Sequence, residues 1–215
     1  MKGLFLFSSY SIVIPAIVGL IRFKKISPSF RPFLWAVWIS AFNEVLSKSL
    51  RSVNEPTAIN NNIYVLIDGL LLLMFFRNFI YRNSRRIFTL LVILVLSAWV
   101  VDNLVFWKIT FVSSYYRIIY SLVIVLSAIT LINYLLTNSR SQIIREPLFL
   151  ISTGLIIFYT IKILVEAFWL YGVSLSPQFQ GNIYYIMVYV NILKNLLFTL
   201  AILWMPRKQI FTMPS

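Results

Sequence analysis

The chain has 215 residues, of which 60% are hydrophobic and only 12% are charged. Soluble domains average roughly 45–50% apolar and about 25% charged residues, so the composition excludes a soluble globular protein. The chain contains neither cysteine nor histidine, which excludes disulfides, thiolate nucleophiles, imidazole bases and the common zinc and haem sites. We therefore expect no cofactor and no metal site.

Seven apolar runs are long enough to cross a bilayer, since a transmembrane helix needs about 20 residues. In chain order the predicted spans are residues 4–23, 32–50, 62–80, 87–107, 115–136, 147–171 and 182–204. The sequence thus predicts an all-α integral membrane protein. We expect a seven-transmembrane-helix bundle that forms a single transmembrane domain over residues 1–215.

Proline residues and polar stretches mark the limits of these spans. Pro15 predicts a kink in the first span. Pro147 suits the first turn of the sixth span. Polar connections are expected over residues 51–61, 137–146 and 172–181.

Basic residues of the loops and span ends are divided unevenly between the two sides of the membrane. Twelve lie on one side: Arg22, Lys24, Lys25, Arg31, Arg77, Arg82, Arg85, Arg86, Arg140, Arg145, Arg207 and Lys208. Three lie on the other side: Lys2, Arg51 and Lys108. Because the side richer in Lys and Arg usually faces the cytoplasm, we expect an N-terminus outside and a cytoplasmic C-terminus, in a bacterial inner (cytoplasmic) membrane.

The net charge of +13 is explained by this topology, and we expect no nucleic acid partner. The basic side suits the anionic headgroups of the lipid bilayer.

Ionisable residues inside the spans carry most of the functional information, because a charge in hydrocarbon is costly unless it is paired or functional. Four acids balance four bases: Glu44, Asp68, Asp102 and Glu166 against Lys48, Arg117, Lys162 and Lys194. Each acid lies roughly 8–9 Å from the outer end of its span, at ~1.5 Å per residue. We expect groups at one depth to converge.

Two acid–base pairs are spaced four residues apart and share a helix face, namely Glu44 with Lys48 and Lys162 with Glu166. We expect each pair to be mutually neutralising. The sequence further predicts a charged pocket in the outer half, reachable from outside, with Lys194 at its floor. The ligand-binding candidates are Glu44, Asp68, Asp102, Arg117, Lys162, Glu166, Asn191 and Lys194, and no catalytic residue is assigned.

A sensor or receptor-like module is the favoured function. It would bind a small polar ligand from the outside, between helices of the bundle, and act through a cytoplasmic or membrane signalling partner. One alternative is a transporter of small solutes or ions, because Asn62-Ile63-Tyr64 and Asn182-Ile183-Tyr184 open two spans in the same way. Another is a lipid-modifying membrane enzyme that uses carboxylates for acid–base chemistry. The charges could instead serve only as contacts between helices.

Lys194 in the seventh span and Asp68 in the third give an outline similar to that of microbial rhodopsins. In that family the lysine carries retinal as a Schiff base and the third span supplies its counter-ion. Here Val190 stands four residues before Lys194 in place of an aspartate, and the third span, YVLIDGLLLLMFF, lacks the Arg, Trp and Thr pattern of the family. The sixth span has no Trp-x-x-Tyr-Pro. We therefore expect no retinal, and an ion-pair role for the lysine.

Overall fold

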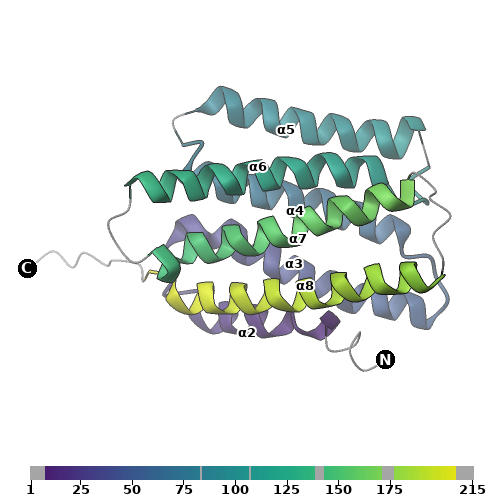
Figure 1. Cartoon of the computed structure of the whole chain (residues 1–215), viewed down its shortest axis with the longest axis horizontal. Helices are drawn as coiled ribbons and strands as arrows, with labels where there is room; N and C mark the ends of the chain where they lie inside the picture. The colour runs from purple at the N-terminus through teal and green to yellow at the C-terminus, as the bar shows by residue number, and fades with distance from the viewer. Residues whose placement is uncertain (1–7, 83, 107, 139–142, 171–176, 207–215) are drawn as a thin grey trace, which may run out of the picture.

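The computed structural model describes residues 8–82, 84–106, 108–138, 143–170 and 177–206. These residues form seven α-helices (Figure 1): α2 (Val13–Arg22), α3 (Arg31–Ser52), α4 (Ala58–Phe79), α5 (Arg85–Val100), α6 (Ser114–Asn138), α7 (Pro147–Leu170) and α8 (Pro177–Trp204). Each predicted span overlaps one of these helices, so the prediction of an all-α fold is confirmed.

Among the described residues, five helical segments are long and apolar enough to cross a membrane: Ala58–Phe79, Arg85–Phe106, Ser114–Asn138, Pro147–Leu170 and Tyr185–Trp204. The apolar stretch Ser8–Arg22, which contains α2, is shorter. Helix α3 carries Glu44 and Lys48 together with several serines in its second half. The protein is thus a polytopic, all-α membrane protein whose apolar helices suit a lipid bilayer. Seven spans and their orientation stay predictions.

Six of the seven helices close into a ring. In order around the ring the helices are α2, α3, α4, α6, α7 and α8, and α8 packs against α2 to close it. Helix α5 packs outside the ring against α4 and α6 (Figure 1). The contact between α2 and α8 is fixed at one end, where an Nη1–H group of Arg22 donates to the carbonyl of Leu203. Most large side chains of α5 are exposed, Leu90 by 66%, as expected for a helix that faces lipid.

Consecutive helices run in alternating directions along the long axis of the bundle (Figure 1). We call one end of the bundle the loop-53 end, because residues 53–57 connect α3 to α4 there. The opposite end, where α4 stops at Phe79, is the loop-80 end. Both α2 and α8 finish at the loop-80 end, where the Ser27 N–H donates to the carbonyl of Pro206 at 3.2 Å.

Aromatic side chains fill the loop-80 half of the ring. This aromatic core consists of Phe30, Phe33, Phe75, Phe79 and Phe198. The rings of Phe33 and Phe198 meet edge to face with centroids 4.8 Å apart, and Phe33 also contacts Phe75 at 5.6 Å. These are favourable separations for aromatic pairs. Phe33 and Phe75 are completely buried, so this half of the bundle is closely packed.

Two helix starts differ from the prediction. α4 begins at Ala58, inside the stretch predicted as a polar connection. The reason is that Asn60 lies against α3 and donates through Nδ2 to Oδ1 of Asn43 at 2.8 Å and to Ser47 at 3.0 Å. α8 begins at Pro177, also inside a predicted connection, of which residues 172–176 lie outside the described part.

The kink expected at Pro15 takes the form of an interruption before α2. Residues 8–10 are helical, Ser11 and Ile12 form a turn, and α2 starts at Val13. Proline has no N–H to donate to the carbonyl four residues earlier, and its ring crowds that carbonyl. The helix is therefore interrupted around Ser11, the residue four positions before Pro15.

Candidate functional site

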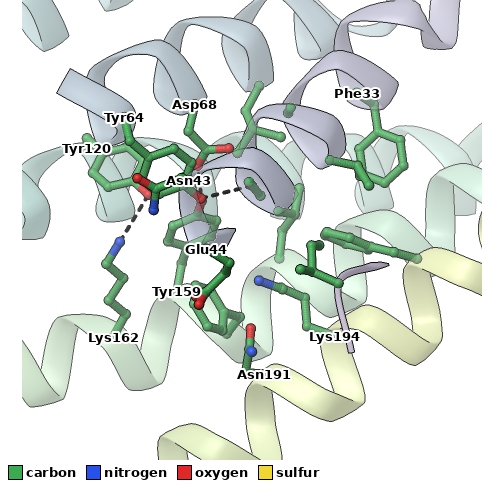
Figure 2. A pocket seen from close by; sticks show the side chains of 18 of the residues that line it. Phe33, Asn43, Glu44, Tyr64, Asp68, Tyr120, Tyr159, Lys162, Asn191 and Lys194 are labelled. Carbon is green, nitrogen blue, oxygen red and sulfur yellow. Dashed lines mark hydrogen bonds between the residues drawn. The ribbon is translucent and has the colours of Figure 1, made fainter. Parts of the chain in front are cut away.

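A cavity of about 160 Å³ lies inside the helix ring. Its lining comes from α3, α4, α6, α7 and α8, together with Ser9 and Ile12 just before α2. Five of the predicted site residues line it: Glu44, Asp68, Lys162, Asn191 and Lys194 (Figure 2). The structure thus brings together charged side chains that are up to 150 positions apart in the chain, from Glu44 to Lys194.

The cavity is polar toward the loop-53 end and apolar toward the loop-80 end. Leu72, Leu155 and Phe198 line its loop-80 side. Leu72 lies one helical turn from Asp68, Leu155 two turns from Lys162, and Phe198 one turn from Lys194. Phe198 also belongs to the aromatic core. Lys194 is one turn from Phe198, and so lies just above this apolar floor.

Asp68 is the most buried charged group of the cavity, with 4% of its surface exposed. The Tyr159 hydroxyl donates a hydrogen bond of 2.7 Å to its Oδ2, and the Tyr120 hydroxyl donates a longer one of 3.5 Å to the same atom. Lys162 in turn donates from Nζ to the Tyr120 hydroxyl at 3.2 Å. A buried carboxylate needs such donors, because its hydration is lost. The contacts connect α4, α6 and α7 through side chains.

Gly69 permits this arrangement of tyrosines. The rings of Tyr116 and Tyr120 are stacked 5.5 Å apart, and Tyr120 meets Tyr159 edge to face at 5.3 Å. A Cβ atom on Gly69 would lie only 3.1 Å from Cδ2 of Tyr120. The absence of a side chain there lets the Tyr120 ring approach α4 closely enough for its hydroxyl to reach Asp68.

Glu44 reaches the cavity from α3, the neighbour of α4 that carries Asp68, and Lys194 reaches it from α8 (Figure 2). The Lys194 ammonium lies over the ring of Phe158, 3.9 Å from its centroid, which is a favourable cation–π distance. Within the described part of the chain, neither Glu44 nor Lys194 makes a hydrogen bond or an ion pair. Both groups are half-buried and face the cavity without a hydrogen bond from the described residues of the protein.

Asp102 does not join this cavity, so its predicted convergence with the other acids is wrong. It lies on a π-helical turn, Val101–Phe106, that follows α5. Its Oδ2 accepts the backbone N–H of Tyr116 at 2.8 Å, in the first turn of α6. The first N–H groups of a helix lack partners within that helix, and a carboxylate there is also stabilised by the helix dipole. Asp102 therefore holds α5 to the start of α6.

Arg117 and Glu166 lie beside the cavity but do not line it. Arg117 Nη1 contacts Glu166 Oε1 at 3.2 Å, forming an ion pair between α6 and α7. The predicted pairing of Lys162 with Glu166 is therefore wrong. Although they share a helix face, Glu166 contacts the arginine of the adjacent helix, whereas Lys162 contacts Tyr120.

The second predicted pair, Glu44 with Lys48, is also not formed. Lys48 Nζ lies over the ring of Tyr10, 3.4 Å from its centroid. Glu44 instead faces the cavity one turn away. A spacing of four residues brings side chains to one helix face, but a neighbouring segment supplies the better partner.

Sequence reasoning missed Tyr159, the closest partner of Asp68. Tyr159 precedes Lys162 by three residues, and residues three apart on a helix are neighbours on its surface. A tyrosine and a lysine at this spacing within an apolar run indicate that both side chains lie on the same polar face of the helix. Tyr64, which also lines the cavity, contacts the Ser40 hydroxyl at 2.9 Å.

Among the described residues, no group of three or more His, Cys, Asp or Glu side chains is placed to hold a metal ion. Comparisons of the chain with protein-family models, with curated proteins and with solved structures found no match.

Proposed function

We propose that the protein is a receptor-like sensor that binds a small polar ligand in the cavity within the helix ring. The observation that carries this proposal is the convergence of four charged side chains, from α3, α4, α7 and α8, on one cavity of about 160 Å³. Pockets between helices with a few oriented polar groups are common ligand sites. A ligand that touches all parts of the ring would favour one packing of the helices over another.

Two charges of the cavity, Glu44 and Lys194, differ from those that hold helices together. Arg117 and Glu166 neutralise each other, and Asp102 accepts a backbone N–H group. Neither Glu44 nor Lys194 makes a hydrogen bond or a close ion pair in the described structure. Because a charge without hydrogen bonds in a low-dielectric interior is costly, a bound polar molecule in the cavity would stabilise both groups.

A sensor is favoured over a transporter because of the aromatic core. A transported solute has to leave the cavity on the opposite side, and the fully buried rings of Phe33 and Phe75 occupy that half of the ring. Transport would require these closely packed rings to separate in each cycle.

We propose that the loop-53 end faces the outside and the loop-80 end faces the cytoplasm, in a bacterial inner membrane. Support comes from the basic residues at the loop-80 end: Arg22, Lys24, Lys25, Arg31, Arg77, Arg82, Arg85, Arg86 and Arg145. In this orientation the ligand enters from outside, and a cytoplasmic or membrane partner receives the signal.

Thermal unfolding of the detergent-purified protein tests ligand binding. The probes are amino acids, small carboxylates, small amines and sugars, each at millimolar concentration. At least one class should raise the melting temperature, because a ligand at 100 times its Kd stabilises the native state by about 2.7 kcal/mol. Asp68→Asn should abolish the response. Asp102→Asn, which alters a buried aspartate outside the cavity, should retain it.

Uptake into proteoliposomes separates a sensor from a transporter. The stabilising compound should bind without accumulating inside the vesicles, whereas accumulation would show transport. If no probe class stabilises the native protein, or if Asp68→Asn responds as the native protein does, the proposed site is wrong.

A further inference from the structure

The charged residues of the cavity are separated by sign onto two walls. The acids, Glu44 and Asp68, come from α3 and α4, which are neighbours in the ring. The bases, Lys162 and Lys194, come from α7 and α8, which are also neighbours. Around the ring, α6 lies between α4 and α7, and α2 lies between α8 and α3. The acidic wall and the basic wall therefore face each other.

Each wall retains unused hydrogen-bonding capacity. The hydrogen bonds of Asp68 go to Oδ2, and Glu44 has no hydrogen bond within the described structure. On the opposite wall Lys162 uses one of its three N–H donors, on Tyr120. Lys194 contacts aromatic rings, but no acceptor among the described residues. The cavity therefore offers free acceptors on one side and free donors on the other.

We propose that the cavity binds a small zwitterion of amino-acid size, with its ammonium group toward Glu44 and Asp68 and its carboxylate toward Lys162 and Lys194. This inference rests on the proposed ligand-binding function and specifies the chemical class of the ligand. A ligand with only one charge would leave the free donors or the free acceptors of the opposite wall unused. A zwitterion supplies a counter-charge to both walls and adds no net charge to the membrane interior.

The volume of the cavity sets the size of this ligand. An apolar protein cavity of about 150 Å³ accommodates benzene, which has six heavy atoms. The present cavity of about 160 Å³ therefore suits a compound with about six heavy atoms, such as alanine. The aromatic core below the floor limits any extension toward the loop-80 end.

Matched probes test the inference with the full-length protein in detergent. Alanine carries both charges, propionate lacks the ammonium group, and ethylamine lacks the carboxylate. Glycine and β-alanine vary the separation between the two charges. By calorimetric titration, at least one zwitterion should bind about ten- to hundredfold more tightly than propionate and ethylamine, as expected for one lost charge-assisted contact.

Two variants then assign the ends of the ligand. Glu44→Gln should weaken binding of the zwitterion about tenfold and leave binding of propionate unchanged. Lys194→Met should weaken both. Glu55→Gln, an exposed acid in the loop at the same end, is the matched control and should change neither.

The outcomes distinguish this inference from the proposed function. If propionate or ethylamine binds as tightly as every zwitterion, or if a sugar is the only ligand, the two-wall assignment is wrong while ligand binding stands. If no probe binds at all, the inference and the proposed function both fail.

Discussion

The hydroxyl of Tyr159 donates a hydrogen bond of 2.7 Å to Oδ2 of Asp68, joining α7 to α4 across the ring. These two residues are 91 positions apart in the chain. The bond provides the shortest polar contact of the cavity wall, and it places a carboxylate in the membrane interior in a defined orientation.

Tyr159→Phe should destabilise the protein by about 1.5–3 kcal/mol, the range for a hydrogen bond to a charged group. The variant leaves Asp68 with only the 3.5 Å contact from Tyr120. Thermal unfolding in detergent measures the effect. Tyr134→Phe makes the same chemical change at a residue of α6 that is 50% exposed, and it should have little effect. Equal melting temperatures for the two variants would contradict a structural role for the Tyr159 hydroxyl.

Glu166→Gln should destabilise the protein by about 2–3 kcal/mol, because it leaves the guanidinium of Arg117 without its counter-charge. This is less than the ~3–5 kcal/mol of a fully buried pair, since the two side chains are 15% and 10% exposed. Adding Arg117→Leu to Glu166→Gln should restore much of the stability.

Adding Lys162→Met to Glu166→Gln provides the comparison for that rescue. Lys162 contacts Tyr120 rather than Glu166, so this second combination should not restore stability. Rescue by Lys162→Met, but not by Arg117→Leu, would show that Glu166 pairs with Lys162 of the same helix and not with Arg117. Both doubles are measured by thermal unfolding under identical conditions.

Gly69→Ala should be more destabilising than Gly19→Ala, by about 1–3 kcal/mol. Both substitutions gain about 1 kcal/mol of helix propensity, and both place a Cβ atom against a neighbour, at 3.1 and 3.2 Å. The neighbour of Gly69 is the rigid Tyr120 ring, whereas the neighbour of Gly19 is the terminal methyl of Leu34. A methyl group moves by rotation of its side chain, but a stacked ring does not. The prediction fails if Gly19→Ala has the lower melting temperature.

Single cysteines test the orientation, because the chain contains none of its own. Glu55→Cys lies at the loop-53 end and Lys25→Cys at the loop-80 end, and both positions are exposed. A membrane-impermeant maleimide should label Glu55→Cys in intact cells and Lys25→Cys only after permeabilisation. The reverse pattern would overturn the proposed orientation. Labelling of both in intact cells would contradict the location of the two ends on opposite sides.

Helix formation and membrane insertion follow from local properties of the sequence. Runs of apolar residues about as long as the hydrocarbon is thick specify membrane helices regardless of their neighbours. The predicted spans 115–136 and 147–171 accordingly agree with α6 and α7 to within two residues at each end. The prediction was less accurate at Asn60 and Asn61, where polar residues are helical because α3 supplies their hydrogen-bond partners.

An all-α membrane protein with balanced charges inside its helices follows from the amino-acid sequence, because length and hydropathy are properties of each segment alone. Which charges face a common cavity depends on how the helices pack. Helical spacing places Lys162 and Glu166 on one face, but the packing of α6 against α7 pairs Glu166 with Arg117. The position of α5 outside the ring likewise removes Asp102 from the cavity. Such partners come from helices distant in sequence, and their choice depends on packing and hydrogen-bond geometry that no single segment encodes.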